Sequence, residues 1–170
     1  PADCGPAVIS MSQDVQGEAY DYPEIFFEER IHEIRRIHPD PNQIQKAADK
    51  LKNSKQPIII SGGGVLYSEA EEEISAFAKK HNIPVTATVM GIGCMNKDDP
   101  YYISAIGCLG EGSSNNLATD TDLALAIGTK LGDFTTGSWT NFENENFQLV
   151  SINTSRFDTT KHRATPVVSD

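Results

Sequence analysis

The chain has little positive charge and no long apolar segment. Its 170 residues include 14 Lys and Arg against 24 Asp and Glu, which gives a net charge of −10. Such a surface repels phosphate backbones and its few basic residues do not cluster, so we expect no nucleic-acid partner. No apolar run approaches the roughly 20 residues of a membrane-spanning helix, so we expect no contact with a membrane. The chain begins on Pro1 without the features of a secretory signal, and we interpret it as a piece of a longer protein.

Cysteine is also scarce. The three cysteines are Cys4, Cys94 and Cys108, an odd number, and no C-x-x-C or zinc-type spacing occurs. This pattern predicts reduced thiols in a cytoplasmic protein, without disulfides or a metal site. All three are interpreted as buried thiols that take no part in chemistry, which is the usual behaviour of a free cysteine.

The common catalytic and phosphate-binding motifs are missing. The chain has no Gly-x-Gly-x-x-Gly, no Gly-Lys-Ser/Thr of a P-loop, and no Gly-x-Ser-x-Gly nucleophile elbow. An ordinary NAD-binding domain, a P-loop enzyme and a serine hydrolase are therefore disfavoured. We predict no catalytic residue and no metal ligand within this chain.

From residue 40 onward the pattern alternates between helix and strand. Residues 40–43 combine an N-cap aspartate, a first-position proline and a glutamine placed to close a capping box, and an apolar helical face follows. A second capping box at residues 68–71 predicts a helix that runs to about His81. Residues 113–118 can start a short helix. Continuous apolar runs predict strands at residues 57–61, 84–89, 122–127 and 147–152. We therefore predict an α/β fold, a Rossmann-like parallel sheet with helices on both faces, over residues 39–170.

The first 38 residues read differently. Residues 5–11 predict a short buried strand, and residues 28–38 show a weak amphipathic pattern with isoleucine at every third position. Between them lie Tyr20, Tyr22, Phe26 and Phe27, which are too many aromatics for a free linker. We interpret this stretch as an arm that lies on a surface outside the chain, and we expect its aromatics to be exposed.

Small residues follow several predicted strands. In a parallel sheet, ligands bind beyond the carboxyl ends of the strands, where small residues and free N–H groups can hold a phosphate. The candidate cofactor-binding residues are Gly62, Gly63, Gly64, Met90, Gly91, Gly128, Thr129 and Asn153. The alternative is that these glycines serve only the tight turns between strand and helix.

Several stretches resemble one enzyme family. Residues 5–10 (GPAVIS) are similar to the last strand of the pyrimidine-binding domain of thiamine-diphosphate enzymes. Five further stretches are more specific and resemble the trihydroxycyclohexane-1,2-dione hydrolases of myo-inositol catabolism. They are QDVQGEAYDYP at 13–23, GGGVLYS at 62–68, DFTTGSW at 133–139, FD at 157–158 and KHRA at 161–164. Ile92 stands where that family usually has lysine, and this feature resembles the acetolactate synthases.

The resemblance implies that residues 1–38 are the last strand of a preceding pyrimidine domain plus a linker arm, and that 39–170 are the central domain. The parent enzyme would open 3D-(3,5/4)-trihydroxycyclohexane-1,2-dione to 5-deoxyglucuronate with thiamine diphosphate and Mg²⁺, which its other domains would hold. Asn115 and Asn116 lack the preceding Gly-Asp-Gly of the family's metal segment, so this chain would carry no cofactor. The missing pyrimidine and pyrophosphate domains would be its partners, in a homo-oligomer. The alternative is a nucleotide- or FAD-binding module of an acetolactate-synthase-type enzyme, which would use the strand-end residues as a vestigial nucleotide pocket.

Overall fold

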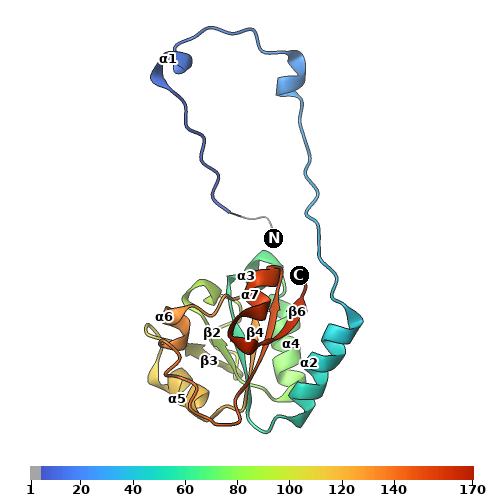
Figure 1. Ribbon diagram of the computed structural model, residues 1–170, viewed down its shortest axis with the longest axis vertical. Helices are drawn as coiled ribbons and strands as arrows, with labels where there is room; N and C mark the ends of the chain where they lie inside the picture. Colours follow the sequence, from blue (N-terminus) through green and yellow to red (C-terminus); the bar gives the residue numbers. More distant parts are fainter. Residues whose placement is uncertain (1–4) are drawn as a thin grey trace. The chain divides into compact units, whose positions relative to one another are not determined.

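The computed structural model describes residues 5–170 (Figure 1). These residues divide into two units, one that ends at Arg35 and one that begins at Arg36. The first unit contains only a short helix, α1 (Gln13–Gln16), and a 3-10 turn, η1 (Glu24–Phe27). The second unit contains the sheet and the remaining helices.

One sequence expectation for the first unit is wrong. Residues 5–11 form no strand, because a strand needs a hydrogen-bonded neighbour and the described residues supply none. Residues 28–38, where the sequence shows only a weak amphipathic pattern, form neither helix nor strand, because a short pattern of this kind is not stable without a surface to pack on. The expected exposure of the aromatics is confirmed: Tyr20 and Phe27 are each 72% exposed. These aromatic side chains contact one another. The centre of the Tyr22 ring lies 4.9 Å from that of Phe26 and 6.2 Å from that of Phe27.

The second unit is built on a parallel sheet of six strands in the order β3-β2-β1-β4-β5-β6. In chain order the strands are β1 (Pro57–Ser61), β2 (Val85–Ala87), β3 (Tyr102–Ala105), β4 (Leu123–Ile127), β5 (Gln148–Asn153) and β6 (Thr165–Val168). Ile59 pairs with Val85 of β2 on one side and with Leu125 of β4 on the other. This is the Rossmann strand order, and it confirms the predicted fold class. The direction of winding reverses between β1 and β4.

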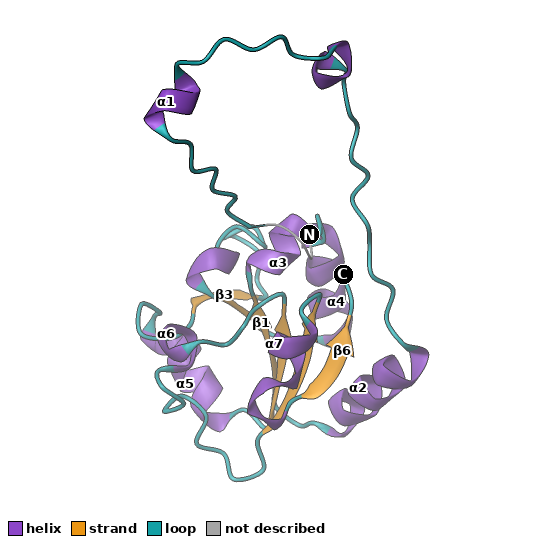
Figure 2. Cartoon of the chain, turned by 45° about the horizontal axis from the view of Figure 1, so that its top comes forward, coloured by secondary structure: helices purple, strands orange, loops and turns teal. Residues whose placement is uncertain are grey.

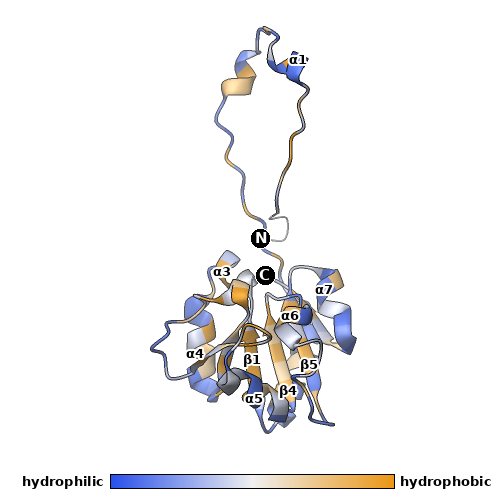
Figure 3. Cartoon of the chain, turned by 90° about the vertical axis from the view of Figure 1, so that its left-hand side faces the viewer, coloured by the Kyte–Doolittle hydropathy of each residue, from blue (hydrophilic) through white to orange (hydrophobic). Residues whose placement is uncertain are grey.

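The central strands are apolar along their length because helices cover both of their faces. Ile58 and Ile60 pack on one side of the sheet and Ile59 on the other, and all three are at most 1% exposed. β1 and β4 are orange in the hydropathy colouring of Figure 3, between paler and bluer helices. The predicted strands at 57–61, 84–89, 122–127 and 147–152 are confirmed as β1, β2, β4 and β5, with β2 shorter than expected.

The helices form a layer on each side of the sheet. One layer holds α2 (Pro41–Asn53), α3 (Gly63–Tyr67) and α4 (Glu71–His81). The other holds α5 (Gly112–Asp120) and α6 (Asp133–Thr136), and α7 (Arg156–Thr160) lies against β5 and β6. Figure 2 shows α2 and α4 on one side of the strands and α5 and α6 on the other. Within residues 5–170, no helix has both the length and the apolar composition that a bilayer crossing requires.

Of the two predicted capping boxes, the first is partly right. Asp40 is the N-cap of α2, where its carboxylate accepts the Asn42 N–H at 2.7 Å, but Gln43 accepts the N–H of Val168 instead of closing the box. The second box is wrong. The Ser68 hydroxyl donates to the Asp170 carboxylate, and Glu69 takes a positive φ of 55°, so α4 begins only at Glu71.

Candidate functional site

The candidate residues meet at the carboxyl edge of the sheet, beyond the point where its winding reverses. The Gly62 N–H donates to the carbonyl of Ile127, the last residue of β4, at 2.8 Å. Two residues on, the Gly64 N–H donates to the Gly128 carbonyl at 2.9 Å. The loops that follow β1 and β4 are therefore bonded directly to each other.

The glycines are packed backbone against backbone. A Cβ on Gly62 would lie 2.3 Å from the Gly128 oxygen, and one on Gly64 would lie 2.5 Å from the Gly128 Cα. A Cβ on Gly91 would lie 2.2 Å from the Ser61 oxygen. Backbone atoms at these distances cannot move aside as a flexible side chain can, so these positions require glycine. Gly128 also has a φ of +63°, a conformation that other residues adopt only at a cost.

The same contacts occupy the N–H groups that a phosphate would need. The N–H groups of Gly62 and Gly64 are bonded as described, that of Gly91 donates to the Thr88 carbonyl at 2.8 Å, and that of Gly128 donates to the Ile152 carbonyl at 2.9 Å. The helix that follows Gly62, α3, is only five residues long. These four donors are therefore satisfied within the fold, and an anion would have to displace backbone carbonyls to bind them.

The remaining candidates join the same cluster. Asn153, at the end of β5, donates from its side-chain amide to the Thr129 carbonyl at 3.2 Å and accepts the Ser155 N–H at 2.9 Å. The Thr129 hydroxyl oxygen accepts the Leu131 N–H at 3.2 Å. Met90 differs from the others, because its backbone contacts Gly63 while 71% of the residue is exposed. All eight candidates thus lie along one edge, where two of the hydrogen bonds join one candidate to another and the rest join candidates to neighbouring residues of the same loops and strands.

A second loop at this edge was missed by the sequence analysis. Asn115, in the first turns of α5, accepts the Gly107 N–H at 2.9 Å and donates to the Gly107 carbonyl at 3.1 Å. The next N–H, that of Cys108, donates to the Phe134 carbonyl at 2.7 Å. The amide side chain therefore fixes the loop after β3, which is a structural role.

The cysteines follow the prediction in part. Cys94 is fully buried, and burial raises the pKa of its thiol, which keeps the group protonated. The expectation that Cys108 is buried is wrong, because Cys108 lies exposed in the loop after β3. Cys4 falls outside the described residues.

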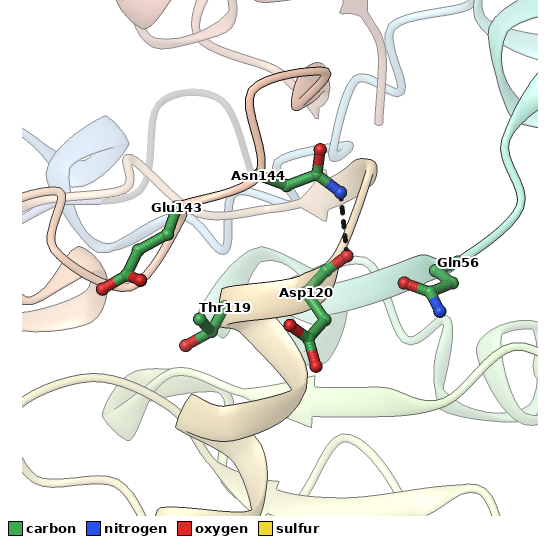
Figure 4. A pocket seen from close by; sticks show the side chains of 5 residues that line it. All are labelled: Gln56, Thr119, Asp120, Glu143 and Asn144. Atoms are coloured by element: carbon green, nitrogen blue, oxygen red, sulfur yellow. Dashed lines mark hydrogen bonds between the residues drawn. The ribbon is translucent and has the colours of Figure 1, made fainter.

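A shallow depression of about 380 Å³ lies at the opposite edge of the sheet (Figure 4). It is lined by Gln56, Thr119, Asp120, Glu143 and Asn144, and the Asn144 amide donates to the Asp120 carbonyl at 3.0 Å. Gln56 precedes β1 and Asp120 precedes β4, so this depression is remote from the strand-end glycines. Across residues 5–170, no group of three or more His, Cys, Asp or Glu side chains is arranged to hold a metal ion.

Comparison with known proteins agrees with this architecture. Residues 44–170 match the family described as the central domain of thiamine pyrophosphate enzymes. Over all 170 residues the chain is 42% identical to a 3D-(3,5/4)-trihydroxycyclohexane-1,2-dione hydrolase of Clostridium botulinum and 41% identical to that of Clostridium perfringens. It spans 26% and 27% of the length of those relatives, about a quarter.

A solved structure from Mycobacterium smegmatis, titled as a candidate thiamin diphosphate-dependent enzyme, has a similar fold. The TM-score is 0.63 at 17% identity, over 83% of this chain and 28% of the other. At that identity the likeness shows the fold alone. The family match covers most of the folded unit and agrees with its strand order. The chain therefore belongs to the family of thiamine pyrophosphate enzyme central domains.

Proposed function

We propose that this chain is the non-catalytic central domain of a carbon–carbon hydrolase that opens the ring of 3D-(3,5/4)-trihydroxycyclohexane-1,2-dione to 5-deoxyglucuronate in myo-inositol catabolism. The observation that carries the proposal is the identity of 41–42% over all 170 residues to curated hydrolases of that name. The likeness includes the first 43 residues, which lie outside the family match.

The role of the domain would be scaffolding. Gly62, Gly64, Gly91 and Gly128 are closed by backbone contacts and their N–H groups are engaged, so this edge is suited to fixing loops rather than to holding a diphosphate. The described residues also do not fit Mg²⁺, since they contain no cluster of acidic ligands. Thiamine diphosphate, which supplies a carbanion to such reactions, and Mg²⁺ would be held by the pyrimidine and pyrophosphate domains of the parent.

The proposal extends to the organisation of the parent. Residues 1–38 would be the end of the pyrimidine domain plus a linker, in which residues 5–11 would become a strand only beside the sheet of that domain, and residues 39–170 would be the central domain. The parent would be a cytoplasmic homo-oligomer. The exposed aromatics of the first unit support this division, because large exposed apolar groups in a short arm mark a contact with another surface.

The alternative, a nucleotide- or FAD-binding module of an acetolactate-synthase-type enzyme, is not favoured. The relatives at 41–42% identity carry the hydrolase name. In addition, a nucleotide phosphate would find the N–H groups of Gly62, Gly64, Gly91 and Gly128 already bonded.

The test is the activity of the full-length protein. Supplied with thiamine diphosphate and Mg²⁺, it is expected to open the cyclic dione and to leave pyruvate unchanged. Conversion of pyruvate to acetolactate without ring opening would contradict the proposal. A full-length protein that needs added FAD for turnover would contradict the scaffolding role.

A further inference from the structure

Six of the nine exposed large apolar residues of the second unit lie at the carboxyl edge of the sheet. These six follow four different strands: Val89, Met90 and Ile92 after β2, Leu109 after β3, Phe134 after β4 and Phe157 after β5. Their exposure ranges from 48% to 73%. We name these six residues the apolar edge face. Since parallel strands end at the same edge, loops far apart in the sequence contribute to one surface, on either side of the strand-end glycines.

Charge is absent from one part of this face, the segment that follows β2. No charged residue occurs from Thr88 to Asn96, a stretch that contains half of the apolar edge face. The loops at the amino edge carry acidic residues instead, at 98–99, 120–122 and 143–145. The other part of the face is not free of charge, since Asp133 precedes Phe134 and the Lys161 ammonium lies 4.6 Å from the centre of the Phe157 ring. In a chain of net charge −10, the uncharged apolar stretch after β2 is typical of a contact that is permanently covered.

The loops that present the apolar edge face are held rigidly. The turn η2 (Val89–Gly91) is closed by the Gly91 N–H, which donates to the Thr88 carbonyl, and Gly91 rests directly on the Ser61 carbonyl. The loop of Leu109 is fixed by the Asn115 side chain and by the bond from the Cys108 N–H to the Phe134 carbonyl. A surface fixed in this way loses little conformational entropy when another surface covers it.

We propose that the apolar edge face docks against the rest of the parent polypeptide, on an apolar surface of a thiamine-diphosphate-binding domain. This inference rests on the proposed function. Relatives of this chain continue for about three-quarters of their length outside the matched region, so a covalently linked partner of ample size is available. A linked partner is held at high effective concentration and needs no charge to steer it, which agrees with the lack of charge from Thr88 to Asn96.

Cys108 provides a native reporter, because it is exposed beside Leu109. In the full-length protein, alkylation by N-ethylmaleimide is followed for each cysteine by mass spectrometry. The matched control is Lys52→Cys, an exposed position in α2 and away from the face. We expect native Cys108 to react about tenfold more slowly than the control cysteine, and the two rates to converge in urea. Equal rates in the native protein would overturn the proposal.

Two variants exclude other reasons for slow labelling. Leu109→Asp places a charge on the face and is expected to raise the alkylation rate of Cys108 toward that of the control cysteine. Ile44→Asp changes an exposed apolar residue of α2 and is expected to leave the rate unchanged. An unchanged rate in Leu109→Asp would contradict docking. Protection that disappears when the protein is diluted to monomers would assign the face to a second copy and overturn the intrachain contact. Labelling needs no turnover, so protection in a protein that fails to open the dione would refute the proposed function alone.

Discussion

Substitution of Gly64 by alanine is expected to destabilise the chain, because the added methyl group has no space. The new Cβ would lie 2.5 Å from the Gly128 Cα and 3.0 Å from its carbonyl oxygen. The clash is relieved only if the loops after β1 and β4 move apart, and this movement weakens the hydrogen bond from the Gly64 N–H to the Gly128 carbonyl. Overpacking costs about 1–3 kcal/mol and the weakened bond about 1 kcal/mol. Alanine in α3 regains about 1 kcal/mol of helix propensity.

The net loss in the free energy of unfolding is therefore about 2 kcal/mol, measurable by urea denaturation of the 170-residue chain. Gly112→Ala is the matched control, since it lies at the start of α5 with no heavy atom within 4 Å of its added Cβ. That variant is expected to be as stable as the parent chain or slightly more stable. If Gly64→Ala unfolds at the same urea concentration as Gly112→Ala, the strand-end glycines are not tightly packed and the reasoning fails.

Three further outcomes are expected from the fold. Asp122→Asn should lower the free energy of unfolding by roughly 1–2 kcal/mol near pH 7, because the Asp122 carboxylate accepts three hydrogen bonds, one of them from the Ser54 hydroxyl. Burial raises the pKa of Asp122, but the hydrogen bonds outweigh burial and the pKa is lowered. The stabilisation by the carboxylate is therefore present above about pH 4 and is lost as the pH falls through the folded pKa. The stabilities of the two proteins should converge in acid, and a constant difference in urea denaturation down to about pH 2 would contradict this. Ile60→Ala should cost about 3 kcal/mol in the same assay, since Ile60 is fully buried, and a loss below about 1 kcal/mol would show that the sheet is not packed as described. Cys94 should resist alkylation in the folded chain while Cys108 reacts, as followed by peptide mass spectrometry, and equal rates would contradict the burial of Cys94.

The predicted elements that the structure confirms are those with a strong local signal. Residues 57–61 form β1 because three consecutive isoleucines suit a strand buried on both faces, and Asp40 with Pro41 marks the start of α2. The short elements were missed, among them β6, where Pro166 weakens the strand pattern although an edge strand tolerates it. Residues 5–11 show the converse error, since an apolar run forms no strand without a partner.

The site illustrates the same limit. Sequence position placed the glycines at the strand ends, and the strand order brings them together. The sequence could not show that Gly62 and Gly64 pack on Gly128, because that contact joins residues more than sixty positions apart. The second capping box failed for a similar reason: the partner of Ser68 is Asp170, at the far end of the chain. Long-range contacts of this kind depend on the assembled sheet and leave no local pattern.

The account depends most on the closed state of the carboxyl edge, and ligand titration of the 170-residue chain tests it directly. Isothermal titration calorimetry with thiamine diphosphate plus Mg²⁺, with FAD and with ADP is expected to show no saturable heat, because the N–H groups of Gly62, Gly64, Gly91 and Gly128 are bonded within the fold. A saturable site of micromolar affinity for any of these ligands, lost on substitution at Gly62 or Gly128, would contradict the account.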